Sequence, residues 1–434
     1  MNIRIILFGT FLLFTIGMEA APYTLQQCID TALVNNLSVR QQANRLASQR
    51  LAYKQSKANI SPELYGNIGQ SWGFGRSTGA DNISRIQNSS QTSFNLSANL
   101  MLFDGLAMKF NIDEAAANMQ ASEADLQAQQ LQIKMNVTTM FLQVLLCRQL
   151  TETAATQLAD TQAKLQRDSA LVAAQRLAAG ELYTLQAQVA KEQLALVQQQ
   201  NELRLALLDL AQAIDIQDMA SFDIVVSDAD TLLLLPLSAQ EVYDAALTYR
   251  PEIAALEYTI AAQEAALKSA KAAYSPTLSA GASVGSGYYN MQGSDNLPFA
   301  EQMNENFTAS VGLNLSVPLY DRMQTTTRMR QQRLAVDNAK LQLAQQKQTL
   351  RKEIDQAYYN ALSAQLEEQS AMEAERSAAE ALRYAEQKQE AGRASAYEYR
   401  EAKNTYAQAL ATRLQARYNL LFRIRILHYY QGIL

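Results

Sequence analysis

The sequence predicts a mixed α and β fold in which one large unit occurs twice, and three observations support this prediction. First, Asp30–Pro62 returns as Asp244–Pro276 without an insertion or a deletion. Second, a short section of each copy alternates between apolar and polar residues, which is typical of β-strands. Third, each copy contains a long segment without proline or glycine that carries a seven-residue apolar repeat, which indicates long packed helices.

The duplication gives the expected domain boundaries. Phe103-Asp104 corresponds to Tyr320-Asp321, and Gly180 is paired with Gly392. A period of about 210 residues is far longer than the roughly 20–50 residues of a solenoid repeat. We therefore expect a signal peptide at 1–21, a first repeat at 22–220 and a second repeat at 221–434.

The N-terminus predicts an export signal. Arg4 supplies a positive charge, Ile5–Ile16 is an apolar run, and Ala20-Ala21 is a small-residue cleavage site. The run is too short to cross a bilayer as a helix, and no later segment approaches about 18 consecutive apolar residues. We expect the mature chain to leave the cytoplasm without a transmembrane helix.

Composition argues against several classes of function. The net charge is -5 and no basic stripe is present, which argues against a nucleic-acid partner. The single histidine, His428, excludes a His–His metal site within the chain and disfavours a histidine-based catalytic triad. Cys28 and Cys147 form no CxxC motif, so we expect two buried side chains without a disulfide or a lipid anchor. No catalytic residue, metal or cofactor is expected.

Four segments alternate with the period of a β-strand. In Ser93–Phe103 the even positions are apolar and the odd positions are mostly Ser and Asn, and Thr308–Val317 shows the same pattern. Leu64–Phe74 and Leu278–Tyr288 alternate more loosely. Each copy thus contributes two strands of about ten residues with one apolar and one polar face.

We expect these strands to form β-hairpins at 63–104 and 277–320, with polar loops at about 76–91 and 290–306. Strands of about 9–11 residues fit a tilted membrane strand, and a face rich in Gly, Ser and Asn fits a wet lumen. A soluble sandwich would instead need an opposing apolar layer. The rest of the sequence offers only helices that are too long to cover the sheet.

Long helices follow each hairpin, at about 106–178 and 323–390, and each would extend roughly 100 Å. A heptad stripe runs through both. In the second copy it consists of Leu343, Leu350, Ala357, Ala364, Ala371, Ala378 and Ala385, and in the first of Leu126, Ile133, Met140, Cys147 and Ala154. Gly180 and Gly392 are expected to be the left-handed residues at which two helical hairpins reverse.

The returning helices, at about 182–214 and 394–426, are about half as long as the outgoing ones. Helical patterns at 25–60 and 239–273 would supply the missing half by stacking end to end on them. The expected unit is a strand hairpin with a long helical hairpin projecting from it.

Four strands per chain cannot close a barrel, because eight is the practical minimum. An open sheet would leave unpaired edges in lipid, which is very costly. The chain must therefore oligomerise, and the physical argument favours three or more copies without fixing the number.

The whole mature chain resembles the TolC family of outer-membrane efflux channels. The resemblance rests on the duplication, on Arg250-Pro251-Glu252-Ile253, on Phe103-Asp104-Gly105 and on Ala391-Gly392 followed by Ala416–Leu420. It implies a homotrimer with a 12-stranded outer-membrane β-barrel continued by a periplasmic α-helical coiled-coil barrel. It also implies an equatorial collar near 215–238, and a periplasmic adaptor and an inner-membrane pump that meet the Gly180 and Gly392 tips.

The resemblance further implies a ring of carboxylates at the periplasmic aperture, formed by Glu398 and Glu401. Their i, i+3 spacing places both on one helix face, and such rings favour cations. The alternative is an ordinary solvated helix face. The family's latch residues are replaced by Gln389 and Ala394. After the first tip glycine, the pairing of Gly180 with Gly392 gives Gln186 and Val189 in place of the two glutamates, so the gate is expected in one copy only.

The function expected from this resemblance is a passive exit duct for efflux or type I secretion in the outer membrane of a Gram-negative bacterium. The alternative is a structural or adhesive trimer without transport. Known coiled-coil adhesins place all four strands at the C-terminus, whereas here the pairs are separated by about two hundred residues. A soluble periplasmic enzyme is a third, weaker alternative. The transported substrate is not indicated by the sequence.

Overall fold

The computed structural model describes residues 22–78, 82–86, 88–176, 178–216, 222–225, 235–236, 238–293, 295–391, 393 and 395–433. The expected signal peptide at 1–21 therefore lies outside the described residues. The chain divides into two compact units. One consists of Met1–Arg40, Gln129–Tyr249 and Leu350–Leu434, and the other of Gln41–Ala128 and Arg250–Thr349.

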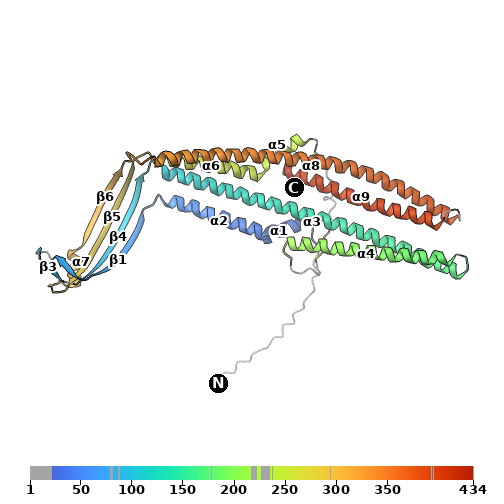
Figure 1. Ribbon diagram of the computed structural model, residues 1–434, viewed down its shortest axis with the longest axis horizontal. Coiled ribbons are helices and arrows are strands. Elements are labelled where there is room, and N and C mark those ends of the chain that lie inside the picture. Colours follow the sequence, from blue (N-terminus) through green and yellow to red (C-terminus); the bar gives the residue numbers. More distant parts are fainter. Residues whose placement is uncertain are drawn as a thin grey trace, which may run out of the picture. The chain divides into compact units, whose positions relative to one another are not determined.

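The elements occur in nearly the same order in the two halves of the chain (Figure 1). The helices are α1 (Leu25–Asn35), α2 (Leu37–Ala58), α3 (Ala107–Ala173), α4 (Ala179–Ala213), α5 (Ala239–Tyr249), α6 (Pro251–Ala272), α7 (Phe299–Glu305), α8 (Gln324–Glu390) and α9 (Ala396–Gln431). The strands are β1 (Glu63–Gly73), β2 (Arg76–Thr78), β3 (Ser84–Ile86), β4 (Ser89–Phe103), β5 (Thr277–Met291) and β6 (Thr308–Ser316). None of the described helices is long and apolar enough to cross a membrane.

Corresponding helices have equal lengths, which makes the duplication visible in the structure. α1 and α5 both have 11 residues, α2 and α6 both have 22, and α3 and α8 both have 67. The first two pairs are offset by 214 positions (α1 starts at Leu25, α5 at Ala239), whereas α3 and α8 are offset by 217 (Ala107 and Gln324). The three extra positions of the second copy are therefore inserted between the first strand and the long helix.

The helical pattern expected at 25–60 is confirmed, but it is divided into α1 and α2 because the chain breaks at Asn36. The Asn36 side chain accepts hydrogen bonds from the backbone N–H groups of Ser38 (2.9 Å) and Val39 (3.3 Å), so it caps the start of α2. In the second copy Arg250 has the corresponding place, and Pro251 starts α6 at a position where its missing N–H is harmless. The two copies thus build the same break with different residues.

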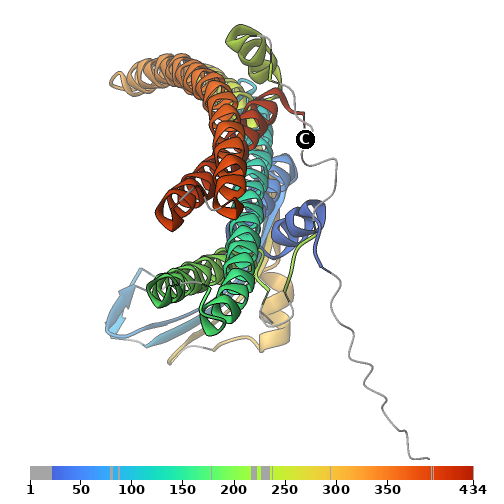
Figure 2. The same ribbon diagram turned by 90° about the vertical axis from the view of Figure 1, so that its right-hand side faces the viewer.

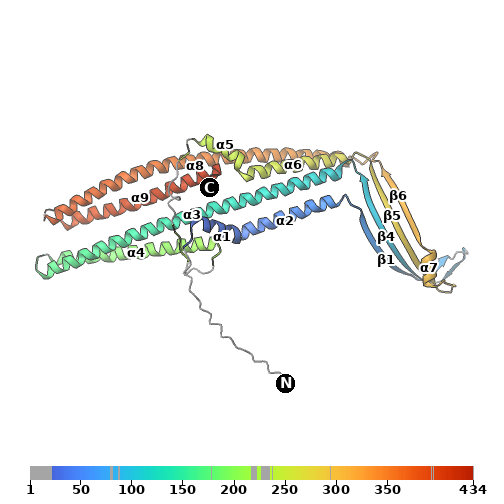
Figure 3. The same cartoon turned by 180° about the vertical axis from the view of Figure 1, so that it is seen from behind.

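The Gln41–Ala128 and Arg250–Thr349 unit contains one four-stranded antiparallel sheet in the order β1-β4-β5-β6 (Figure 3). Pairing of β1 with β4 and of β5 with β6 confirms the two expected strand hairpins, and β4 pairs with β5 to join them. A register shift between Met101 and Phe103 marks a bulge in β4. The two segments expected as polar loops contain the short β2–β3 ribbon and the helix α7, which were not predicted.

The other unit contains α4, α9 and the later parts of α3 and α8, which form two hairpins, α3 with α4 and α8 with α9; Figure 2 shows these hairpins from the end at which they turn. Thr151 on α3 donates to the Gln199 carbonyl of α4 (3.1 Å), and Arg413 on α9 pairs with Glu375 on α8 (2.9 Å). All twelve residues of the heptad stripes are buried or half-buried. The expected coiled-coil packing face is confirmed.

Helix ends meet within this unit, as expected from stacking of short helices on the returning ones. Asn35 at the end of α1 donates to the carbonyl of Ile214, just after α4 (3.5 Å). Gly432 ends α9 in a left-handed conformation (φ 77°), and a Cβ there would lie 2.7 Å from the ring of Tyr249 at the end of α5. Only glycine fits this contact without movement of the ring.

The expected collar segment at 215–238 is described only in part. Tyr23 forms a parallel β-bridge with Ile224, and Arg148 on α3 donates to the Ile224 carbonyl (2.8 Å) and pairs with the Asp223 carboxylate. These contacts fasten the start of the described chain to the segment that follows α4.

The three residues considered for chemistry in the sequence have packing roles in the structure. Cys28 and Cys147 are both free and buried, and burial raises the pKa of the Cys28 thiol to about 12. A buried thiol of that pKa is unsuited to nucleophilic attack. His428 is half-buried in the last turn of α9, where its carbonyl accepts the Ile433 N–H (3.0 Å).

Candidate functional site

The sheet has one apolar face whose residues lie in register across all four strands. The rows are Phe103-Leu278-Leu315, then Leu100-Ala280-Leu313, Leu64-Ala98-Ala282-Val311, Gly66-Leu96-Val284-Ala309 and Ile68-Phe94-Ser286. From Phe94 to Phe103 the face measures roughly 27 Å along the strand. At the roughly 40° tilt of membrane strands, this length corresponds to about 20 Å along the membrane normal, close to the height of the apolar band of an outer-membrane barrel.

The opposite face of the sheet is mostly polar and small, with Tyr65, Met101 and Tyr289 among its larger side chains. It carries Asn67, Ser71, Ser93, Asn95, Ser97, Asn99, Ser279, Gly281, Ser283, Ser310, Gly312 and Asn314. Glu63, at the first position of β1, is its one ionised side chain within the four strands as described. Such a face can be wetted by water and offers many weak hydrogen-bonding groups, but almost no fixed charge to select a solute.

Neither face of the sheet is covered by an apolar layer from the described part of the chain. Val311, Ile68 and Leu313 are 86%, 77% and 70% exposed. An apolar face of this size exposed to water marks an interaction surface or a membrane surface. The soluble-sandwich alternative is therefore not supported by the described residues.

The small helix α7 lies at the loop end of β5. The buried side chain of Gln302 accepts from Tyr289 N–H (2.8 Å) and donates to the carbonyls of Tyr289 (2.9 Å) and Leu297 (2.8 Å). The ring of Phe299 packs on Tyr288 at 5.4 Å. These contacts close the loop onto the strand, and they place aromatic residues at the level where the apolar face ends.

The turn of the first helical hairpin differs from the expectation for Gly180. α3 ends at Ala173 and α4 begins at Ala179, so Gly180 lies in the first turn of α4 and has no left-handed φ. The left-handed residue of this turn is Gln175, with φ 60°. Gly392, Ala394 and the conformation of the second turn at these positions lie outside the described residues.

Helix boundaries also correct the pairing of the two tips. α8 ends at Glu390 and α9 begins at Ala396, so both turns have five residues and are offset by 217 positions. By this count Gln175, and not Gly180, is the counterpart of Gly392. The counterparts of Glu398 and Glu401 are then Glu181 and Thr184, rather than Gln186 and Val189. One carboxylate of the pair is thus present in both copies.

The structure places Glu398 and Glu401 together on an exposed face in the first turns of α9. Ser395 caps this helix by accepting the Glu398 N–H (3.2 Å). A carboxylate in the first helical turn is also favoured by the helix dipole. Glu181 has the same place in the first turn of α4, which lacks a side-chain cap.

Gln389, at the position of a latch residue in the family that the chain resembles, has a hydrogen-bond partner on another helix. Its side-chain oxygen accepts a hydrogen bond from the Lys164 ammonium of α3 (2.7 Å). The same ammonium lies 3.4 Å from the centre of the Tyr399 ring of α9, close enough for a cation–π interaction. Burial lowers the pKa of Lys164 to about 8; Asp168 opposes this shift, and Arg167 and Lys403 add to it.

A second lysine, Lys403, ties α9 to the first hairpin. Its ammonium pairs with Glu192 of α4 (3.4 Å), and it donates to the Thr161 hydroxyl and the Gln157 carbonyl of α3. The Lys403 and Glu192 side chains are only 15% and 12% exposed. Loss of one partner from so buried a pair leaves an uncompensated charge, which is strongly destabilising. Neither lysine was predicted from the sequence, because nothing local distinguishes Lys164 or Lys403 from a surface lysine.

Because of Lys164, the stability of the folded chain is expected to depend on pH in the alkaline range. The folded chain releases this proton near pH 8, whereas the unfolded chain keeps it until about 10.5, so the free energy of unfolding rises with pH between these values. Between pH 7 and pH 10 we expect the free energy of unfolding of the wild type to rise by about 1 kcal/mol relative to that of Lys164→Met, after allowance for solvent screening. Urea unfolding of both proteins at the two pH values measures this gain. A stability difference that does not change with pH would contradict it.

Gly180→Ala tests the corrected turn. A Cβ at Gly180 meets no atom within 4 Å, and alanine is the better helix former. We expect no loss of stability and a gain of up to about 1 kcal/mol. A left-handed Gly180 would instead make alanine destabilising by about 1 kcal/mol or more. Urea unfolding distinguishes the two signs.

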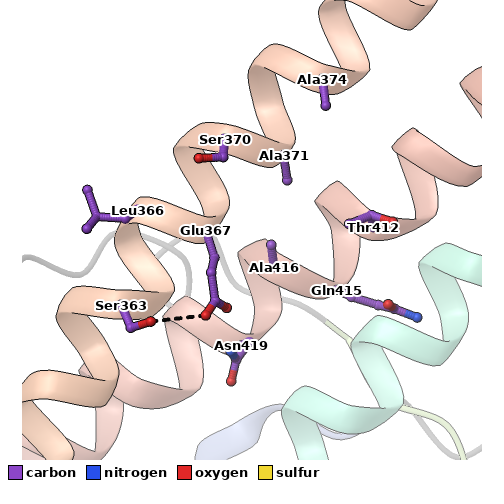
Figure 4. A pocket seen from close by; sticks show the side chains of 10 residues that line it. All are labelled: Ser363, Leu366, Glu367, Ser370, Ala371, Ala374, Thr412, Gln415, Ala416 and Asn419. Carbon is purple, nitrogen blue, oxygen red and sulfur yellow. Dashed lines mark hydrogen bonds between the residues drawn. The ribbon is translucent and has the colours of Figure 1, made fainter.

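Between α8 and α9 the structure has an open groove of about 790 Å³ (Figure 4). Small side chains from both helices line it, among them Ala371, Ala374, Thr412 and Ala416. Ser363 donates to Glu367 along one wall (3.0 Å). Small residues allow another helix to approach closely. Within the described residues no cluster of three potential metal ligands occurs, and the groove has no catalytic constellation.

Comparisons with known proteins agree with this geometry. Residues 28–215 and 242–424 match a family model described as outer membrane efflux protein. The chain is 24% identical over 362 residues to the outer membrane efflux protein BepC of Brucella suis biovar 1 (strain 1330), covering 82% of this chain and 72% of BepC.

Similar folds occur in solved structures. A CusC structure, from work on folding and transmembrane channel formation, superposes with a TM-score of 0.78 at 18% identity, covering 94% of this chain and 91% of CusC. The outer membrane protein VceC from Vibrio cholerae gives 0.75 at 16% identity, covering 94% and 96%. The Campylobacter jejuni CmeC outer membrane channel gives 0.74 at 17%, covering 94% and 85%.

Proposed function

Because the chain belongs to the outer membrane efflux protein family, we propose that three copies form the exit duct of a tripartite efflux or type I secretion system. The chain is an outer-membrane protein with a large periplasmic part, and its relatives are channel proteins rather than enzymes. The observation that carries the proposal is the four-stranded sheet with an apolar face, a polar face and two unpaired edges. Three such sheets supply the 12 strands of a barrel with a wet interior.

Self-association is supported on the helical side as well. α4 exposes an apolar stripe of Leu194 (58%), Val197 (50%), Leu205 (48%) and Leu208. The groove between α8 and α9 is lined by small residues and is open to another helix. An apolar stripe and a small-residue groove are complementary in the manner of coiled-coil packing. We propose that α4 of one copy packs in the α8–α9 groove of the next.

The duct would be passive and would open at its periplasmic tip. A periplasmic adaptor would contact the hairpin turns next to Gly180 and Gly392, and an inner-membrane pump would supply the energy. The Lys164–Gln389 and Lys403–Glu192 contacts between the hairpins would keep the tip closed, since separation of the two hairpins breaks this hydrogen bond and this ion pair. Glu398 and Glu401 of three copies would place six carboxylates at the aperture and favour cations.

Single-channel recording in a planar bilayer tests this proposal. We expect Glu398→Ala/Glu401→Ala to conduct and to discriminate less between cations and anions than wild type. Glu181→Ala is the matched control, because it removes a carboxylate from the corresponding turn of the other hairpin. It should leave the selectivity unchanged. A protein that never conducts, even with Glu398 and Glu401 replaced, would rule out the exit duct.

A further inference from the structure

The four strands of the sheet carry one charged side chain. Glu63, at the start of β1, is the only Asp, Glu, Lys or Arg in β1, β4, β5 and β6. A charge that faces lipid is very costly, so an ionisable residue kept in a membrane-spanning segment faces water and marks the path of a solute. Glu63 is therefore a candidate for a role in transport.

Glu63 lies on the polar face of the sheet. Its neighbour Leu64 is on the opposite, apolar face and is 68% exposed there. Glu63 opposes Asn99, and the same row continues through Gly281 and Gly312. A Cβ at Gly312 would meet no atom within 4 Å. The row thus holds few side-chain atoms, and the Glu63 carboxylate is open to the space over the polar face.

A hydrogen bond holds the carboxylate against this face. The Tyr65 hydroxyl donates to the Glu63 carboxylate (3.0 Å), and residues two apart on a strand share a face. The bond directs the carboxylate along β1, away from the end of α2. No ion pair with Glu63 occurs among the residues that the structure describes. The hydrogen bond orients the negative charge without neutralising it.

The other carboxylates at the ends of the strands have a different role. Asp104, just after β4, accepts the Met108 N–H (2.7 Å), and Asp321 accepts the Thr325 N–H (2.7 Å). Each aspartate therefore satisfies a backbone donor in the first turn of a long helix. Glu63 caps no helix, since its hydrogen bond is to a side chain within its own strand.

The second copy shows that the strand hairpin does not need this carboxylate to form. Thr277 starts β5 as Glu63 starts β1, and Thr277 opposes Ser316 as Glu63 opposes Asn99. The pairing is thus the same with an uncharged residue at this position. The charge occurs once in each chain, in the first copy only.

We propose that Glu63 selects for small cations at the helix-side end of the barrel lumen, as a second selectivity element beside the carboxylates of the periplasmic aperture. This inference rests on the proposed exit duct, because the polar face becomes a lumen only when sheets of several copies close into a barrel. Three copies would provide three Glu63 carboxylates at one level of the lumen.

Three such charges are close enough to the axis to influence a passing ion. Twelve strands about 4.8 Å apart and tilted by about 40° give a barrel radius of about 12 Å. An inward carboxylate then lies within roughly 10 Å of the axis, about one Debye length at 0.1 M salt. By Coulomb's law in water, three charges at that distance enrich cations over anions by about fivefold.

Reversal potentials in a planar bilayer test the proposal. The Glu398→Ala/Glu401→Ala variant is the background, so that the aperture carboxylates do not mask the lumen. Adding Glu63→Gln, which keeps the shape and can still accept from Tyr65, should lower the potassium-to-chloride permeability ratio at least about threefold near 0.1 M salt. The difference should vanish near 1 M salt, where the Debye length is about 3 Å.

Two further variants separate charge from structure. Glu63→Asp keeps the carboxylate and should retain the ratio. Thr277→Glu added to Glu63→Gln returns one carboxylate per chain at the corresponding position of the second copy, and it should restore the ratio.

The outcomes distinguish the inference from the duct itself. A conducting Glu63→Gln variant with an unchanged ratio would overturn the role of Glu63 and leave the duct intact. A lowered ratio that Thr277→Glu does not restore would also overturn it, because the effect would then be structural. If neither the background nor any other variant conducts, the exit duct is refuted and the inference with it.

Discussion

Leu313→Arg is expected to destabilise the membrane-inserted protein by about 2–4 kcal/mol. Leu313 lies within β6 on the apolar face, one row from the middle of the apolar band, and is 70% exposed. In a bilayer that exposed surface contacts lipid, and a guanidinium there loses its hydration. The effect should appear in urea unfolding from lipid vesicles and as a lower yield of inserted protein.

The next residue supplies the matched control. Asn314 is exposed on the polar face of the same strand, where arginine remains hydrated in a water-filled interior. Asn314→Arg is therefore expected to change stability little and to alter ion selectivity instead. Leu313→Ala separates the loss of the leucine side chain from the arrival of the charge. Equal effects of arginine at positions 313 and 314 would show that the apolar face does not contact lipid.

The sheet could be predicted from sequence because its two faces differ in polarity. Alternation in Ser93–Phe103 and Thr308–Val317 places apolar residues on one face and mostly polar residues on the other, and β4 and β6 include most of those ranges. Alternation says nothing of the connections, so the seven-residue α7 was missed. Its position depends on Gln302, whose partners Tyr289 and Leu297 do not stand out in the sequence.

The helical tip was predicted less well because its turn depends on a backbone conformation rather than on a pattern. Glycine is the usual left-handed residue, so Gly180 was the natural choice, yet Gln175 adopts that conformation. The cost to a residue with a Cβ is only about 1 kcal/mol, small enough for packing of α3 against α4 to override. The misplaced turn then shifted the comparison of the tips by five residues and hid Glu181 as the counterpart of Glu398.

The lysine contacts could not be predicted for a different reason. Lys403 and Thr161 are about 240 residues apart, and their contact depends on how one helical hairpin is aligned along the other. A heptad pattern fixes which face of a helix packs, but not the axial alignment of two hairpins. Gln389 could therefore be noted from the sequence as a replaced latch residue, but its contact with Lys164 could not be predicted.

The junction between strands and helices is the remaining place where a single side chain should have a large effect. Gly105 lies in the turn between β4 and α3 with φ 69°. A Cβ there would lie 2.5 Å from the Cβ of Ser275 and 2.7 Å from the carbonyl oxygen of Ala272, both at the α6–β5 turn. Neither atom is the end of a flexible side chain, so the two turns would have to move apart.

Gly105→Ala is therefore expected to destabilise the protein by about 2–4 kcal/mol, the sum of overpacking and left-handed strain. The second copy shows that φ alone is not the obstacle, because Arg322 at the corresponding position has φ 54°. Gly312→Ala, in a strand with free space around the new Cβ, should change stability by less than about 1 kcal/mol. Urea unfolding of the two variants measures the difference, and equal effects would mean that the α6–β5 turn does not pack against Gly105.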